Sequence, residues 1–181
     1  ALSGRIPLDW DGKKTVLFLK SVNYNWRQME WWAFYFEWLC RDRLKDSFAI
    51  PGDRIATTTF DARRSINWDF KAKAIKSDDH RAILNDVAAM NQSIAAYGAH
   101  GVIIGLCDVE YNDEDRSFQK WHTALKGGES RYEMERKRRT SLSRYRKVRA
   151  RLDEVLFFVF TARTVSRLGI HHQGRNSNGR P

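Results

Sequence analysis

The most constraining feature of this chain is an aromatic segment, residues 25–45, that contains neither glycine nor proline. Such a segment predicts a helix of about five turns. Between Met29 and Cys40 it is apolar nearly all round, and a helix that is apolar on every side is buried. The fold must therefore supply other layers to cover this helix.

The other apolar runs predict short strands. They are rich in β-branched and aromatic residues and are bounded by glycine, proline or charged residues, and they cover residues 15–20, 55–63, 65–75, 102–109 and 155–161. Two further segments have helical composition, residues 79–97 and 131–151. The order β-α-β-β-α-β-α-β predicts an α/β fold, with a central mixed β-sheet flanked by helices.

Length and composition indicate one folded domain over residues 1–181. The chain has 181 residues, of which 42% are hydrophobic, and this is enough for a packed core. Residues 171–181 are rich in Gly, Asn and Arg and are expected to form a loop or flexible tail. Cys40 and Cys107 are too few for a disulfide framework or a Cys-rich zinc site. With no apolar run of about 18 residues and no leader-like start, we expect a cytoplasmic protein without membrane contact.

Positive charge is concentrated in one block, residues 116–151. The block holds 13 basic and three acidic residues, a net +10, so the other 145 residues sum to zero. A field this local predicts a polyanionic partner on one face, most simply nucleic acid. The alternative interpretation is a solvated basic helix.

The two predicted strands at residues 55–63 and 65–75 together suggest a hairpin. A candidate catalytic site lies in this hairpin, where Asp61 is followed eight residues later by Asp69-Phe70-Lys71. Side chains two apart on a strand share a face, so Asp69 and Lys71 project together and the hairpin brings Asp61 beside them. Two carboxylates can hold Mg²⁺, which lowers the pKa of bound water, while a lysine positions the nucleophile or stabilises the transition state. The alternative is a cross-strand salt bridge.

Two further carboxylates, Glu30 and Glu37, are seven residues apart in the aromatic segment and would share one stripe of its helix. A lone buried charge is costly, so both should be paired. The structural alternative pairs Arg27 with Glu30 and Arg41 with Glu37.

Together these residues resemble the core of the PD-(D/E)xK nucleases: a glutamate in the first helix, Asp61 in a strand and Asp69-Phe70-Lys71 in the next. Several segments also resemble type II restriction endonucleases, namely residues 25–37, 121–133, 143–147 and 173–177. In this comparison Glu37, 24 residues before Asp61, matches the family's helix glutamate better than Glu30, and Asp61 is preferred to Asp53 in the preceding turn.

The resemblance implies a restriction-endonuclease-like core and a restriction-system hydrolase that cuts double-stranded DNA at a specific site. Mg²⁺ would be held by Asp61 and Asp69, with Lys71 as catalytic partner and Glu37 in support. It also implies a homodimer without a small-molecule cofactor.

Contacts to DNA are expected from the basic block and the tail. The candidates are Arg136, Lys137, Arg138, Arg139, Arg144, Arg146, Lys147, Gln173, Arg175 and Asn176. Two other functions fit the same residues: a structure-specific or repair nuclease of the same fold, and a non-catalytic nucleic-acid-binding module.

Overall fold

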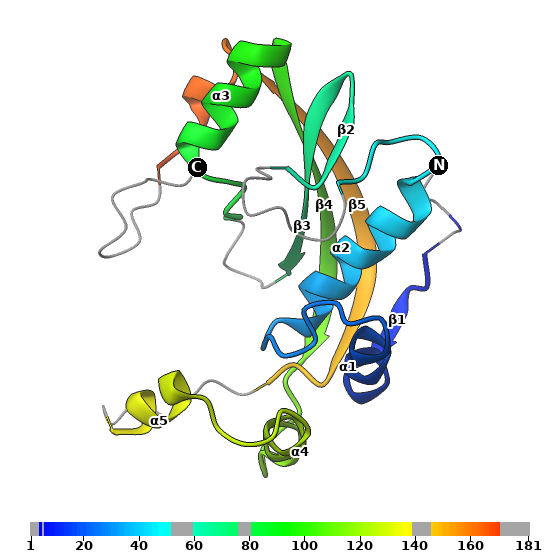
Figure 1. The fold of residues 1–181 in the computed structure, drawn as a ribbon, viewed down its shortest axis with the longest axis vertical. Coiled ribbons are helices and arrows are strands. Elements are labelled where there is room, and N and C mark those ends of the chain that lie inside the picture. The colour runs from blue at the N-terminus through cyan, green and yellow to red at the C-terminus, as the bar shows by residue number, and fades with distance from the viewer. Residues whose placement is uncertain (1–3, 5, 52–59, 76–80, 139–145, 171–181) are drawn as a thin grey trace.

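The computed structural model describes residues 4, 6–51, 60–75, 81–138 and 146–170 (Figure 1). Its centre is a five-stranded sheet with the order β1-β5-β4-β3-β2. The strands are β1 (Asp9–Asp11), β2 (Ala62–Arg64), β3 (Ile66–Ala74), β4 (Ala99–Glu110) and β5 (Arg149–Thr161). The helices are α1 (Gly12–Ser21), α2 (Trp31–Leu44), α3 (Val87–Tyr97), α4 (Ser117–Leu125) and α5 (Arg131–Arg138), followed by a 3₁₀ turn at Val165–Arg167.

The sheet is mixed, which confirms the predicted α/β class. Strands β3 and β4 are parallel and every other neighbouring pair is antiparallel. The parallel pair is joined through α3, which begins where the Asp86 carboxylate accepts hydrogen bonds from Ala88 N and Ala89 N. It ends at Gly98, whose φ of 78° suits glycine and turns the chain directly into β4.

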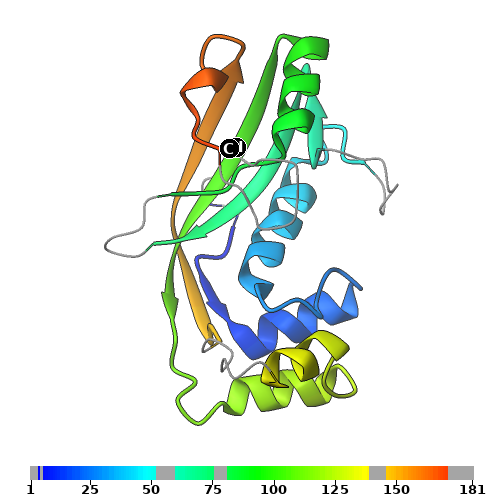
Figure 2. The ribbon, with the colours of Figure 1, turned by 90° about the vertical axis from the view of Figure 1, so that its left-hand side faces the viewer.

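One face of the sheet packs against α2. Phe36 of this helix lies in a buried cluster with Phe70 and Ile103, and Trp68 packs at its margin. Gly105 allows the close approach, because a Cβ atom there would lie 2.7 Å from the Phe36 ring. Figure 2 shows β3, β4 and β5 as one curved layer with α1 and α2 beside it.

The opposite face of the sheet packs against α3. Met90 of that helix is fully buried in a second, smaller cluster with Val102 and Ile104 of β4. Helices α4 and α5 lie at the far end of the molecule from α3 (Figure 1). No helix in the described part of the chain has both the length and the apolar character needed to cross a membrane.

The strand predicted at residues 15–20 is wrong, because this segment lies in α1. The Asp11 side chain accepts a hydrogen bond from Lys14 N and so caps the helix. Thr15, Val16 and Leu19 are buried, a spacing that places them on one face of a helix. Asp11-Gly12 therefore marks the start of a helix.

The long basic helix predicted at residues 131–151 is confirmed over Arg131–Arg138, and residues 139–145 lie outside the described part of the chain. The prediction is wrong at residues 146–151, of which 149–151 begin β5. There Ala150 and Leu152 are buried while Arg149 and Arg151 are exposed, which is the alternation of a strand.

The remaining predictions differ mainly in their boundaries. The helix predicted at 25–45 begins at Trp31, and the one predicted at 79–97 begins at Val87. The strands at 65–75, 102–109 and 155–161 are confirmed within longer or similar limits, whereas β1 and α4 were not predicted. Most of the predicted strand at 55–63 and the tail at 171–181 lie outside the described residues.

Candidate active site

Asp61 is fixed at the open edge of β3. Strand β2 pairs only with Ile66–Trp68, so the next amides of β3 have no strand partner on that side within the described residues. Asp61 takes this place: its N–H donates to Trp68 O over 2.9 Å, and its Oδ2 accepts from Phe70 N over 2.7 Å. The hairpin therefore anchors the Asp61 carboxylate beside the residues that follow on β3.

Lys71 lies between Asp61 and Asp69. Its Nζ is 3.9 Å from Asp61 Oδ2 and 3.8 Å from Asp69 Oδ1. Phe70 points to the opposite face, where it is buried against the α2 layer. The structure thus brings together the three side chains that the strand alternation placed on one face.

Asp69 is held by residues that the sequence interpretation missed. His100 Nε2 lies 2.9 Å from Asp69 Oδ2, and Asn85 Nδ2 donates to the same oxygen. The other ring nitrogen of His100 lies 3.1 Å from Ser93 Oγ. These contacts fix the Asp69 carboxylate with its Oδ1 toward Lys71. The parallel pairing of β3 with β4, which brings His100 opposite Asn67, would have revealed His100, whereas Asn85 lies outside both strands, just before α3.

The structure places Glu37 and not Glu30 near this site. Glu37 accepts a hydrogen bond from the Tyr24 hydroxyl, and its charge acts on Asp61. Glu30 instead pairs with Lys147 Nζ over 2.7 Å and accepts from Trp32 Nε1. Neither alternative arginine pairing is formed, since Arg27 donates to Lys126 O and Arg41 donates to Pro51 O.

The carboxylates interact electrostatically. Burial raises the pKa of Asp61 to about 7, and the nearby Glu37 and Asp69 charges act in the same direction. The Lys71 ammonium and the Phe70 N–H oppose this shift only in part. Burial and the Glu37 carboxylate also raise the pKa of Tyr24, so its hydroxyl remains a donor. Asp61 therefore lies in a local excess of negative charge, since two other carboxylates and only one lysine act on it.

We expect the metal-free protein to lose stability as the pH rises from about 4 to about 7. The folded-state pKa of Asp61 is raised from 3.8 to about 7, so the folded state binds this proton more tightly than the unfolded state. The stabilisation is complete below about pH 4 and is lost between pH 4 and 7, on the order of a few kcal/mol. Because of the Asp61 carboxyl, thermal unfolding in EDTA should give a Tm at pH 8 that is roughly 5–10 °C lower than the Tm at pH 5.

Asp61→Asn removes the titrating proton but keeps an oxygen that can accept from Phe70 N. Its Tm should vary much less with pH and should exceed the wild-type value at pH 8. Asp108→Asn, on an exposed part of β4, is the matched control and should behave as wild type. An unchanged pH profile in Asp61→Asn would contradict the raised pKa.

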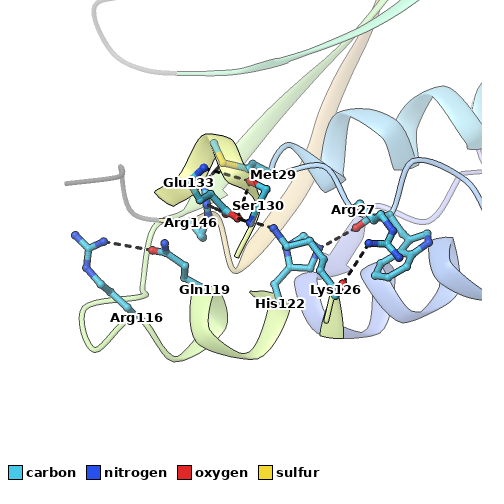
Figure 3. A network of polar contacts seen from close by, with 10 residues as sticks. Arg27, Met29, Arg116, Gln119, His122, Lys126, Ser130, Glu133 and Arg146 are labelled. Atoms are coloured by element: carbon cyan, nitrogen blue, oxygen red, sulfur yellow. Dashed lines mark hydrogen bonds and ion pairs between the residues drawn. The ribbon is translucent and has the colours of Figure 1, made fainter. Parts of the chain in front are cut away.

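Two of the predicted DNA-contacting residues lie in interior contacts. The Arg146 side chain is only 6% exposed, forms an ion pair with Glu133 at 3.5 Å and contacts the Met29 sulfur (Figure 3). Lys147 pairs with Glu30, as described above. Both side chains thus form ion pairs within the chain. A contact of either with a DNA phosphate stays a prediction.

Most of the other predicted DNA-contacting residues lie outside the part of the chain that the structure describes. Arg138 is exposed at the end of α5, as is Arg131 at its start. The side chains of Arg136 and Lys137 and the positions of Arg139, Arg144, Gln173, Arg175 and Asn176 lie outside the described residues.

Polar contacts, one of them buried, connect the basic α4–α5 region to the loop before α2 (Figure 3). His122 Nε2 lies 2.9 Å from Trp26 O, and burial lowers the His122 pKa, which favours the neutral ring. Lys126 Nζ lies 3.3 Å from Glu133, while Lys126 O accepts from Arg27. This end of the molecule is therefore tied to the segment that leads into the Glu37 helix.

The donor set fits a divalent cation in its chemistry. Mg²⁺ prefers carboxylate oxygens, and one or two protein carboxylates suffice when substrate phosphate and water complete the shell. Within the residues that the structure describes, no three His, Cys, Asp or Glu side chains are grouped as a ready-made metal centre.

The chain has no significant match among protein-family models, curated proteins or solved structures.

Proposed function

We propose that this protein is a Mg²⁺-dependent endonuclease that cuts double-stranded DNA at a specific site, as type II restriction enzymes do. The observation that carries the proposal is the convergence of Asp61, Asp69 and Lys71, with Lys71 Nζ within 4 Å of both carboxylates. An ordinary surface salt bridge does not explain this arrangement well, since Asp61 and Asp69 are largely desolvated and Glu37 adds a third negative charge.

Asp61 and Asp69 would hold the Mg²⁺ ion. When bound, the ion supplies a more acidic water and neutralises negative charge on the phosphodiester. The pKa of Asp61, raised first by burial and then by the Glu37 and Asp69 charges, fits this role, because a buried carboxylate beside other carboxylates favours a cation or a proton. His100 and Asn85 act as positioning residues by holding one oxygen of Asp69.

Lys71 would stabilise the charge that develops on the scissile phosphate or orient the attacking water. Its ammonium is partly exposed, with 31% of its side-chain surface accessible, so a phosphate can reach it. Glu37, held by Tyr24, would support the site from α2. The exposed basic residues of α5 and the β5 start would contact the DNA backbone, and a homodimer would match a palindromic site.

We expect plasmid DNA to be cut into discrete fragments with Mg²⁺ and to stay uncut in EDTA. With Ca²⁺ instead of Mg²⁺ the DNA should be bound but uncut, because Ca²⁺ takes a looser geometry and activates water poorly. Gel electrophoresis and a filter-binding assay on the same samples separate cutting from binding. Cleavage that persists in EDTA would reject a two-carboxylate metal site.

The same assay distinguishes the two alternative functions. Cleavage restricted to branched or mismatched DNA would indicate a structure-specific or repair nuclease. The ion pairs of Lys71 with both carboxylates also suit a purely structural role. Binding with no cleavage under any divalent cation would therefore indicate a non-catalytic binding module.

A further inference from the structure

The outer edge of β5 lacks a strand partner over most of its length. Strand β1 pairs only with Arg149–Arg151, and beyond it Leu152 N donates to Leu8 O over 2.8 Å. From Asp153 to Thr161, no strand in the described part of the chain lies along this edge, and Figure 1 shows β5 continuing well past β1. We call these nine residues the β5 edge.

The β5 edge exposes large apolar side chains on both faces of the sheet. Phe157 is 58% exposed, Phe158 40% and Val159 50%. The register with β4 places Phe157 and Val159 on the α2 face and Phe158 on the α3 face. Exposed edges are usually protected by lysine, proline or a covering segment, and this stretch contains neither residue. It is therefore suited to pair with another strand.

Charge at the two ends of the β5 edge selects the partner. Asp153 and Glu154 begin it; Asp153 forms an ion pair with Arg151 at 2.9 Å, which leaves the exposed Glu154 as the acidic group of this end. Arg163 and Arg167 lie just past the other end and are exposed. A second copy laid antiparallel brings the acidic end of each edge against the basic end of the other. A parallel copy would bring like charges together.

We propose that the β5 edge is the dimer interface of this protein, where it pairs antiparallel with the β5 edge of a second copy. A two-fold axis near Phe158 would set Phe157 of each copy beside Val159 of the other and would bring Glu154 near Arg163, which lies in the turn just after β5. The two five-stranded sheets would then form one continuous sheet. This interface would serve the dimer expected of the proposed nuclease. It depends only on the β5 edge, and its test needs neither DNA nor Mg²⁺.

Sedimentation equilibrium of the full chain tests the interface directly. The wild-type protein should be a dimer, and replacing both Phe157 and Val159 by Lys should raise its dissociation constant at least about tenfold. Leu17→Lys is the control, because Leu17 is 48% exposed on α1, away from β5. Circular dichroism checks that each variant is folded, as expected for replacements of exposed side chains.

Charge reversal tests the antiparallel orientation. Glu154→Arg or Arg163→Glu alone should weaken the dimer, and the two changes combined should restore it. A wild-type protein that stays monomeric at every concentration, including one whose own tail covers the edge, would overturn the proposal. So would a dimer that is insensitive to both sets of changes. If the dimer forms as expected but the protein has no nuclease activity, the result would contradict the proposed function and support the proposed interface.

Discussion

Lys71→Ala should reduce the rate of DNA cleavage by about 10²–10³ while leaving the fold and most of the DNA affinity intact. Lys71 is the cation that contacts both Asp61 and Asp69, so its loss removes stabilisation of developing negative charge at the reacting phosphate. Affinity should persist, because the excess positive charge of the chain lies in residues 116–151. Single-turnover cleavage at saturating enzyme measures the rate, and binding in Ca²⁺ measures the affinity.

Lys73→Ala is the matched control for this variant. Lys73 is two residues further along β3, on the same face and with the same charge, so it lies farther along the strand from Asp61 and Asp69. It should cut at close to the wild-type rate. If Lys71→Ala also cuts at the wild-type rate, Asp69-Phe70-Lys71 is only a paired strand segment and the binding-module function is favoured.

The core of the candidate site was predictable because it depends on local geometry. Asp69 and Lys71 share a face through strand alternation, and Asp61 joins them through a short hairpin, so no distant contact is needed. His100 and Asn85 were missed for the opposite reason. Asn85 lies just before α3 and His100 follows it on β4, and no local sequence pattern specifies that either residue reaches Asp69.

The errors in secondary structure have similar causes. Residues 15–20 have the β-branched and aromatic character of a strand, but the Asp11 cap and one buried face make them a helix. At residues 149–151 the charged side chains suggest a solvated helix. Pairing with Glu110 and Asp11 on either side makes the segment a central strand, since packing overrides weak propensity.

Neutralising four residues of the basic block should have the opposite effect to Lys71→Ala. Replacing Arg136, Lys137, Arg138 and Arg139 by Gln should weaken DNA binding and make it less sensitive to salt. Each phosphate that the variant no longer binds should make the slope of log affinity against log salt concentration shallower by roughly 0.9. Cleavage at saturating enzyme should change far less than in Lys71→Ala, because this variant keeps Asp61, Asp69 and Lys71.

The control for this variant removes the same amount of charge elsewhere, at Lys14, Lys20, Arg43 and Lys45. If the local field of residues 116–151 binds DNA, the control should keep nearly the wild-type salt slope although its net charge falls equally. Equal slopes in both variants would mean that DNA responds only to net charge. An unchanged slope in the block variant would mean that this region is an ordinary solvated face. The opposed effects of the Lys71 and block variants on rate and affinity separate catalysis from binding, since a general loss of stability would lower both together.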